Sequence, residues 1–293
     1  MPSNIAFISD IHGNSPALRA VLEDIRRYDC EKIFVIGDII NGLDPSGCVD
    51  LLLETPNVTA LKGNAEYYLL ASDLDTFPKR EEPMYKGLIE LIHWWNAHLS
   101  TTQRAWIQNL PDFIVWNEWL LAHDSPEGRM YPESRYVPGV EEKHQEMYYH
   151  DKGLTPNMEG EELTKLLAFM DAHGFSGVFA GHTHRPFIQS WGEKFVCNTG
   201  SVGMPLDGDP HPSWVLVDRA GQMTLRRIDY DLREIYALVD NTPDYYDFQF
   251  PGCQAAFKKM YGTGIYWGVH LHHPPSPTPH RRTLRTLVGD ESD

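Results

Sequence analysis

The amino-acid sequence predicts an α/β fold, and two patterns support this prediction. The first third of the chain alternates short apolar runs, typical of buried strands, with amphipathic segments typical of helices, which indicates a largely parallel sheet covered by helices. Later strand-like runs follow one another so closely that they favour antiparallel pairing. Polar side chains come directly after several apolar runs, so we expect them at the carboxyl edge of the sheet.

The elements expected in the first part of the chain follow from local signals. Strands are expected at residues 4–9, 32–37 and 58–61, and helices at 15–27 and from Asp44 and Pro45 to about Glu54. The first helix has apolar residues at i, i+3, i+4 and i+7 spacing, and Ser15 with Pro16 offers a cap and a first-turn proline.

The middle of the chain predicts an insertion. Residues 81–109 follow a helical pattern, in which Ser100 caps a second helix. Residues 113–116 and 119–122 predict a hairpin, and 124–158 a long loop or cap. The helical part, residues 81–109, could form a lid beside a site or pack against the sheet, and we favour packing; the whole insertion spans about residues 80–160.

The last part of the chain predicts a return to short strands. The expected elements are a helix at 160–173, strands at 177–180, 187–191, 194–197, 213–218 and 222–228, and a helix at 231–239. We expect the main domain to span residues 1–242. The aromatic-rich extension 243–269 either packs on the core, which we favour, or mediates oligomerisation. Residues 270–293, rich in Pro, His and Arg, predict a disordered tail.

Seven side chains that can bind metal ions come mostly at the ends of short apolar runs. They are Asp10, His12, Asp38, Asn64, His123, His182 and His184. Imidazole with carboxylate suits manganese, iron, zinc or nickel better than calcium or magnesium alone. Seven donors exceed the needs of one tetrahedral ion and suit two ions about 3.5–4 Å apart that share a carboxylate. Asp10 and Asp38 could instead cap helices, and Asn64 could belong to a turn, but the complete set favours metal binding.

The order of these motifs resembles that of the calcineurin-like metallophosphoesterases, in particular the compact prokaryotic phosphodiesterase-type branch. The motifs are Asp-x-His at 10–12, Gly-Asp at 37–38, Gly-Asn at 63–64, His123, Gly-His-x-His at 181–184 and the run 198–210. The resemblance spans roughly residues 3–230. It implies two facing mixed β-sheets flanked by helices, a four-layer αββα fold, with a helical insertion.

The resemblance also implies a role for each ligand. One metal ion would be bound by Asp10, His12, Asp38 and His184, and the other by Asp38, Asn64, His123 and His182, with Asp38 as the bridge. Asp38, Asn64 and His123 would form the catalytic part of the centre, where a metal-bound hydroxide attacks phosphorus. We expect two divalent transition-metal ions, manganese first, with iron, zinc or nickel as alternatives.

The chain departs from the family pattern at one position. Where the family commonly has a histidine followed by an acid after Gly-Asn, this chain has Ala65 and Glu66. The histidine usually protonates the leaving oxygen, and such acid catalysis typically contributes about 10²–10⁴-fold. Ala65 cannot supply it. Glu66 would lose its usual partner, and we expect it to be a surface acid near the site.

Candidate substrate contacts surround the predicted ligands. Arg185 follows the last ligand and could bind a phosphate oxygen, or it could form a surface salt bridge. Asn14 could support the site or cap the first helix. Arg129 and Arg135, in the loop after His123, are further candidates. The residues 200–203 could present backbone N–H groups to substrate or form only a tight turn.

Composition limits the partners. The formal net charge of −16 argues against stable nucleic-acid binding, whereas two metal ions would still attract a small anionic phosphate ester or nucleotide. Four cysteines without a CxxC pair indicate free thiols, and neither a signal peptide nor an apolar run of membrane-spanning length is present in the sequence. We therefore expect a cytoplasmic protein with no membrane partner; a homo-oligomer is compatible with the sequence.

These observations lead to one functional hypothesis and its alternatives. We expect a dinuclear metallophosphoesterase that hydrolyses small phosphodiesters, nucleotides or dinucleoside polyphosphates. A metal-dependent phosphomonoesterase or a protein phosphatase is an alternative within the same chemistry. A non-catalytic scaffold with the same fold is the alternative from another class, and it predicts eroded ligands and an exposed apolar patch.

Overall fold

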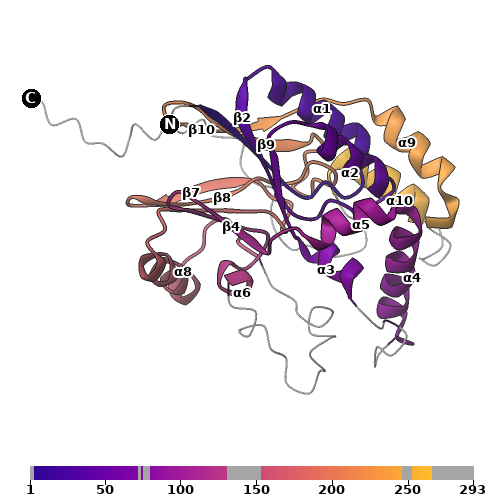
Figure 1. Ribbon diagram of the computed structural model, residues 1–293, viewed down its shortest axis with the longest axis horizontal. Coiled ribbons are helices and arrows are strands. Elements are labelled where there is room, and N and C mark those ends of the chain that lie inside the picture. Colours follow the sequence, from indigo (N-terminus) through magenta and orange to yellow (C-terminus); the bar gives the residue numbers. More distant parts are fainter. Residues whose placement is uncertain (1–2, 72–73, 75–79, 131–152, 246–252, 266–293) are drawn as a thin grey trace, which may run out of the picture.

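The chain folds into two facing five-stranded sheets with helices on both outer sides (Figure 1). The structure is a computed structural model that describes residues 3–71, 74, 80–130, 153–245 and 253–265. Both sheets contain parallel and antiparallel pairs. The fold is therefore the expected four-layer αββα arrangement. The predicted tail 270–293 lies outside the described residues.

The first sheet has the strand order β10-β9-β1-β2-β3. Its strands are β1 (Asn4–Ile8), β2 (Cys30–Ile36), β3 (Val58–Leu61), β9 (Ser213–Val217) and β10 (Met223–Arg227). The first three strands run parallel, as the early strand–helix alternation predicts, because each return crosses over through a helix. The late hairpin β9–β10 joins this sheet by pairing antiparallel to β1.

The second sheet has the strand order β4-β5-β6-β8-β7. Its strands are β4 (Phe113–Trp116), β5 (Trp119–Ala122), β6 (Gly177–Ala180), β7 (Phe187–Trp191) and β8 (Lys194–Asn198). The hairpin predicted at residues 113–122 is confirmed. The expectation that the strands after β6 pair antiparallel is correct for β7–β8 and for β9–β10, but these two hairpins lie in different sheets. β8 also pairs with β6, in parallel.

Most helices lie where the local sequence predicts them. They are α1 (Ser15–Arg26), α2 (Pro45–Glu54), α3 (Asn64–Leu70), α4 (Pro83–His98), α5 (Thr101–Gln108), α6 (Pro126–Met130), α8 (Gly160–His173), α9 (Leu232–Asn241) and α10 (Cys253–Thr263). Ser100 caps α5 as predicted. Three of the described helices were not predicted: α3 directly after β3, α6 within the residues expected to form a loop, and α10 in the C-terminal extension. Within the described chain, no helix is both long and apolar enough to cross a membrane.

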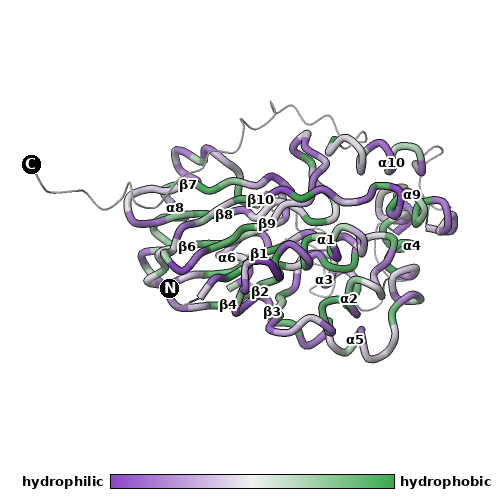
Figure 2. The backbone as a smooth tube through the Cα atoms, turned by 90° about the horizontal axis from the view of Figure 1, so that it is seen from above, coloured by the Kyte–Doolittle hydropathy of each residue, from purple (hydrophilic) through white to green (hydrophobic). Residues whose placement is uncertain are grey.

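Three apolar clusters separate the four layers. The first lies between the first sheet and the helices α1, α2, α4, α9 and α10. The second fills the space between the sheets, where Phe7 stacks on Phe179 with ring centroids 3.8 Å apart. The third joins the second sheet to α8 through residues such as Leu166 and Met170. The strands consequently carry long hydrophobic stretches (Figure 2).

The insertion and the C-terminal extension both pack on the body, where they are described. In α4, Ile92 and Trp95 are fully buried in the same cluster as the first sheet's helices. Tyr245 and the α10 residues Met260 and Tyr261 are buried there too. Packing is thus the observed arrangement of these parts, whereas the predicted domain boundary at 242 stays a prediction.

The aromatic contact between the sheets generates the first prediction. Replacing Phe179 by alanine removes a fully buried ring that packs on Phe7 and Phe195, so the free energy of unfolding should fall by roughly 3–5 kcal/mol. Denaturant titration followed by circular dichroism measures this change. The control is Val115→Ala in β4, whose half-exposed side chain should cost less than about 1 kcal/mol. Equal losses for the two variants would contradict the assignment of this core.

Candidate metal centre

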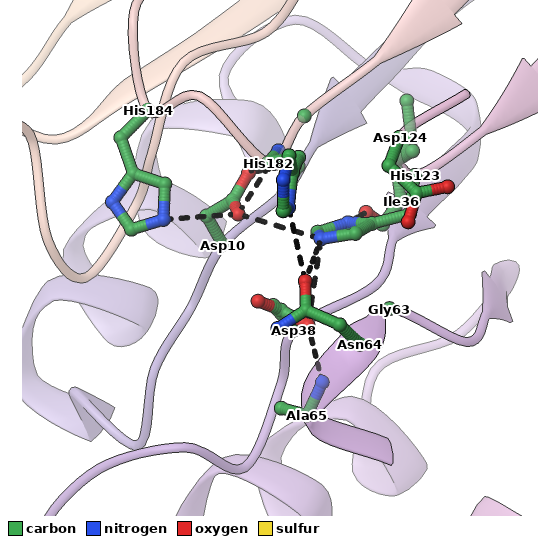
Figure 3. A network of polar contacts seen from close by, with 12 residues as sticks. Asp10, Ile36, Asp38, Gly63, Asn64, Ala65, His123, Asp124, His182 and His184 are labelled. Carbon is green, nitrogen blue, oxygen red and sulfur yellow. Dashed lines mark hydrogen bonds and ion pairs between the residues drawn. The ribbon is translucent and has the colours of Figure 1, made fainter. Parts of the chain in front are cut away.

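The seven candidate ligands meet where the carboxyl ends of strands from both sheets face each other (Figure 3). The first sheet contributes Asp10 and His12 after β1, Asp38 after β2 and Asn64 after β3. The second sheet contributes His123 after β5, and His182 and His184 after β6. The site therefore needs both sheets, and the sheet packing sets the separation of its two halves.

Five of these seven residues have left-handed backbone conformations. Their φ angles are 53° at Asp10, 47° at His12, 53° at Asp38, 68° at His182 and 56° at His184. Residues with a side chain adopt this region rarely, and each such position costs on the order of 1–3 kcal/mol. The surrounding structure must supply that energy, and it does so through hydrogen bonds between loops.

The loops after β1, β2 and β6 are bound to one another. The Asp10 N–H donates to the Gly37 carbonyl at 3.1 Å, and the His12 N–H donates to the Asp38 carbonyl at 3.0 Å. The His182 N–H donates to the Asp10 carboxylate at 3.0 Å. These bonds turn each strand end sharply, so that alternate side chains point toward the same space.

The segment after β8 holds the Asp10 loop from the other side. The N–H groups of Val202 and Gly203 donate to the carbonyls of Ser9 and Asp10 at 3.0 and 2.9 Å, and the Ser201 hydroxyl donates to the Asp10 carbonyl at 2.7 Å. Two N–H groups of this turn are thus used within the protein. The alternative of a structural turn explains this segment better than the alternative of a substrate contact.

Three histidines are oriented by their outer ring nitrogens. Each Nδ1 lies within hydrogen-bond distance of a backbone carbonyl: His123 of Ile36 at 2.7 Å, His184 of Met204 at 2.6 Å and His12 of Asn41 at 3.2 Å. A carbonyl only accepts, so each Nδ1 must carry the proton. When the ring is neutral, each Nε2 then carries a lone pair that faces the centre, which is the arrangement of metal-binding histidines.

The inward-facing donors form two groups. In the first, Nε2 of His184 lies 2.9 Å from Nε2 of His12 and 3.2 Å from Oδ1 of Asp10. Two lone-pair nitrogens at this distance repel each other unless a cation or a proton lies between them. Asp10, His12 and His184 offer ligand atoms that all lie within 4.8 Å of one another. This group therefore fits a bound ion.

The second group lies around Asn64. The Oδ1 atom of Asn64 is 3.1 Å from Nε2 of His123 and 3.0 Å from Nδ1 of His182. Asp38 lies between the groups, with Oδ1 3.4 Å from His123 Nε2 and Oδ2 3.7 Å from His12 Nε2. Its two oxygens thus lie near different groups, which is compatible with a bridging carboxylate.

Comparison with known proteins decides the family. A family model of the calcineurin-like phosphoesterase superfamily domain matches residues 4–221. The chain belongs to the calcineurin-like phosphoesterase superfamily. All seven candidate ligands lie within the matched residues.

Relatives extend over most of this phosphoesterase-family chain. Uncharacterized protein MJ0912 of Methanocaldococcus jannaschii is 29% identical over 252 residues, which cover 80% of this chain and 90% of that protein. Among solved structures, a metallophosphoesterase from Sphaerobacter thermophilus has a TM-score of 0.63 at 22% identity, covering 90% of this chain and all of that one. The hypothetical protein PH1004 from Pyrococcus horikoshii has a TM-score of 0.64 at 17% identity, covering 84% and 95% of the two chains. These structures support the fold.

Buried charged groups shift the pKa values of several residues in the centre. Burial would raise the pKa values of Asp10 and Asp38. The nearby histidines outweigh burial and hold both pKa values well below their usual range. Burial would lower the pKa of His123, but the carboxylates of Asp38 and Asp10 outweigh it and raise that pKa to about 10. At neutral pH the centre therefore holds at least one proton that a metal ion must displace.

The expectation that Glu66 is a surface acid is wrong. Its side chain is fully buried, and its carboxylate accepts hydrogen bonds from backbone N–H groups of Asp38, Ile39 and Gly63. Burial and the neighbouring Asp38 raise the pKa of Glu66, and the backbone N–H donors partly counteract this rise. The resulting pKa is about 7. The sequence signal was available in part, because an acid three residues after Gly63 is typical of a helix first turn. The contacts with the β2 loop were not visible in it.

The structure assigns different surroundings to the candidate substrate contacts. Asn14 is buried and caps α1, accepting from the Ala17 N–H at 3.1 Å, so the cap alternative explains it better than a substrate contact. Arg129 is fully buried against Asp124, with two N–H···O distances of 2.6 Å, which favours a structural role. Arg185 is half-buried, and no hydrogen bond or ion pair engages it within the described chain. Arg135 lies outside the described residues.

The protonated state of the centre generates a prediction about pH. Because His123 must lose its proton before Nε2 can bind a metal ion, manganese affinity should rise with pH between 6 and 8, by about tenfold per unit for each proton displaced. Calorimetric titration in buffers of different ionisation enthalpy measures both the affinity and the protons released. An affinity that stays constant across this range, with no proton release, would show that His123 is already neutral.

Proposed function

We propose that this chain is a dinuclear metal-dependent phosphoesterase that hydrolyses small phosphodiesters, nucleotides or dinucleoside polyphosphates. The observation that carries the proposal is the position of Asp38. One carboxylate oxygen lies nearest His12 and the other nearest His123, which belong to the two neighbouring groups of buried donors, within a superfamily domain of phosphoesterases. Such a pair of sites, when filled, activates a water molecule and neutralises the charge of a phosphoryl group.

The donor set determines which ions we propose. Imidazole nitrogens combined with carboxylate and amide oxygens suit manganese, iron, zinc or nickel, and manganese is our first choice. Asp10, His12, Asp38 and His184 would hold one ion, and Asp38, Asn64, His123 and His182 the other. The carbonyl-bound Nδ1 atoms of His12, His123 and His184 keep their rings in the binding orientation before any ion arrives.

Ala65 supports a preference for diesters and anhydrides. Its side chain is fully buried against apolar neighbours of α3 and cannot donate a proton to a leaving oxygen. Its N–H donates instead to Asp38 Oδ1 at 2.8 Å, so the residue helps to hold the bridging carboxylate. Substrates whose leaving group is already a stable anion, such as a nucleotide phosphate, need an acid least. Monoesters of ordinary alcohols need it most, which makes a phosphomonoesterase the second choice.

We propose two further aspects, a substrate contact and a location. Arg185 is half-buried beside His184 and is proposed to contact a substrate phosphate oxygen. The thiols of Cys30, Cys48 and Cys197 are free, which is the usual state in a reducing compartment, so we propose a cytoplasmic location.

A scaffold without catalysis would have no need to keep seven converging ligands, and this supports the enzyme over the scaffold.

The bridging position generates a direct test of activity. Asp38→Asn keeps the side-chain shape but removes the charge that two ions would share, so hydrolysis of bis(p-nitrophenyl) phosphate with added manganese should fall by at least about 10³-fold. Absorbance of released nitrophenolate measures the rate, and circular dichroism checks that the variant folds. The matched control is Asp229→Asn, an exposed acid outside the site, which should keep full activity. Equal diester turnover by wild type and Asp38→Asn would refute the two-metal proposal.

The alanine at position 65 generates a prediction about leaving groups. Across aryl phosphodiesters that differ only in the ring substituent of one ester, turnover should fall steeply as the pKa of the leaving phenol rises, because Ala65 does not protonate the departing oxygen. Steady-state rates at saturating manganese give the slope of log kcat/KM against that pKa. A flat dependence would mean that another group supplies the proton.

A further inference from the structure

The carboxylate of Glu66 lies behind the candidate metal centre and binds the backbone of two loops at once. Its Oε2 atom accepts from the N–H groups of Gly63 at 2.7 Å and Asp38 at 2.9 Å, and its Oε1 atom accepts from the Ile39 N–H at 2.8 Å. Gly63 is the N-cap residue of α3, whereas Asp38 and Ile39 follow β2. One buried side chain thus joins the ends of two parallel strands of the first sheet.

The conformation of Asp38 explains why a carboxylate fits at this position. With φ at 53°, Asp38 turns its own N–H and that of Ile39 toward the same side of the chain. Successive N–H groups arranged in this way form a concave binding site for an anion. In its ionised form, Glu66 fills this site with two oxygens that only accept. A glutamine would present its NH₂ group to one of the three donors and leave that donor unsatisfied.

The same helix holds the Asp38 side chain. The Ala65 N–H, one residue before Glu66, donates to Asp38 Oδ1 at 2.8 Å. The first turn of α3 therefore binds Asp38 from two sides, the backbone through Glu66 and the carboxylate through Ala65. Gly63 permits this close approach, because a Cβ atom there would overlap the backbone nitrogen and carboxylate of Asp38.

We propose that Glu66 is a positioning residue for the metal centre. It stabilises the left-handed backbone of Asp38, and thereby directs the two oxygens of this carboxylate toward the two donor groups. Glu66 contacts neither the substrate nor the ions, so its effect reaches the centre through Asp38. The inference rests on the two-metal centre of the proposed function, but not on which phosphate ester the centre hydrolyses.

The test compares manganese binding by Glu66→Gln and by a matched helix-cap control. The control is Gln103→Ala in α5, because Gln103 is also a buried residue in the first helical turn and accepts from the Ser100 N–H at 2.9 Å. Calorimetric titration of the full-length proteins with manganese alone gives affinity and stoichiometry, and thermal unfolding gives stability. We expect both variants to lose stability, but only Glu66→Gln to bind manganese about 10–100-fold more weakly, as for other residues that orient metal ligands.

The outcomes separate positioning from general stabilisation. Manganese binding by Glu66→Gln that equals the wild type, or weakening of the same size in Gln103→Ala, would overturn the proposal. Where Glu66→Gln does not fold, Glu66→Asp decides, because its carboxylate is one methylene too short to reach all three donors; weaker manganese binding supports positioning and wild-type binding overturns it.

The same titration distinguishes this inference from the proposed function. A wild-type protein that binds two manganese ions but hydrolyses no phosphate ester would refute the proposed activity, while the affinities of the variants would still decide the role of Glu66. Wild-type protein that binds no manganese or related ion would overturn both.

Discussion

Left-handed backbone turns at the strand ends are the constraint on which the rest of this structure depends. Side chains two residues apart on a continuing strand would both point toward one face of the sheet and not into the space beyond the strand ends. The positive φ angles at Asp10, His12 and Asp38 instead bend each chain back on its neighbour, so that ligands from adjacent strands face one space. Each turn is unfavourable alone, and hydrogen bonds between the loops compensate for it.

These loops depend in turn on the layers beneath them. β1 and β2 end at the same level because they pair in parallel register, and the stacking of Phe7 in β1 on Phe179 in β6 helps to hold the two sheets together. The ligands from β5 and β6 therefore meet those from β1, β2 and β3 without any flexible connection. The geometry of the centre is a consequence of sheet packing. The buried Glu66 also fixes the ends of β2 and β3 relative to each other, because it binds the backbone after both strands.

Much of the fold could be predicted because its signals are local. The β4–β5 hairpin, the Ser100 cap and the strands before each ligand are properties of short segments. Other features depend on distant partners. Asn14 rather than Ser15 caps α1, and nothing in the sequence shows that β9 pairs with β1 while β8 pairs with β6. Glu66 seemed exposed because charged residues usually are, whereas three N–H groups from two loops stabilise it inside.

The division of ligands between the two sheets has a further consequence for how the protein unfolds. An ion held by Asp10 and His12 from one sheet and by His184 from the other would act as a cross-link between the two halves of the molecule. Separating the sheets would then require release of that ion first. Filled sites would slow the unfolding reaction itself, so resistance to proteases and heat would report metal loading even where no substrate is known.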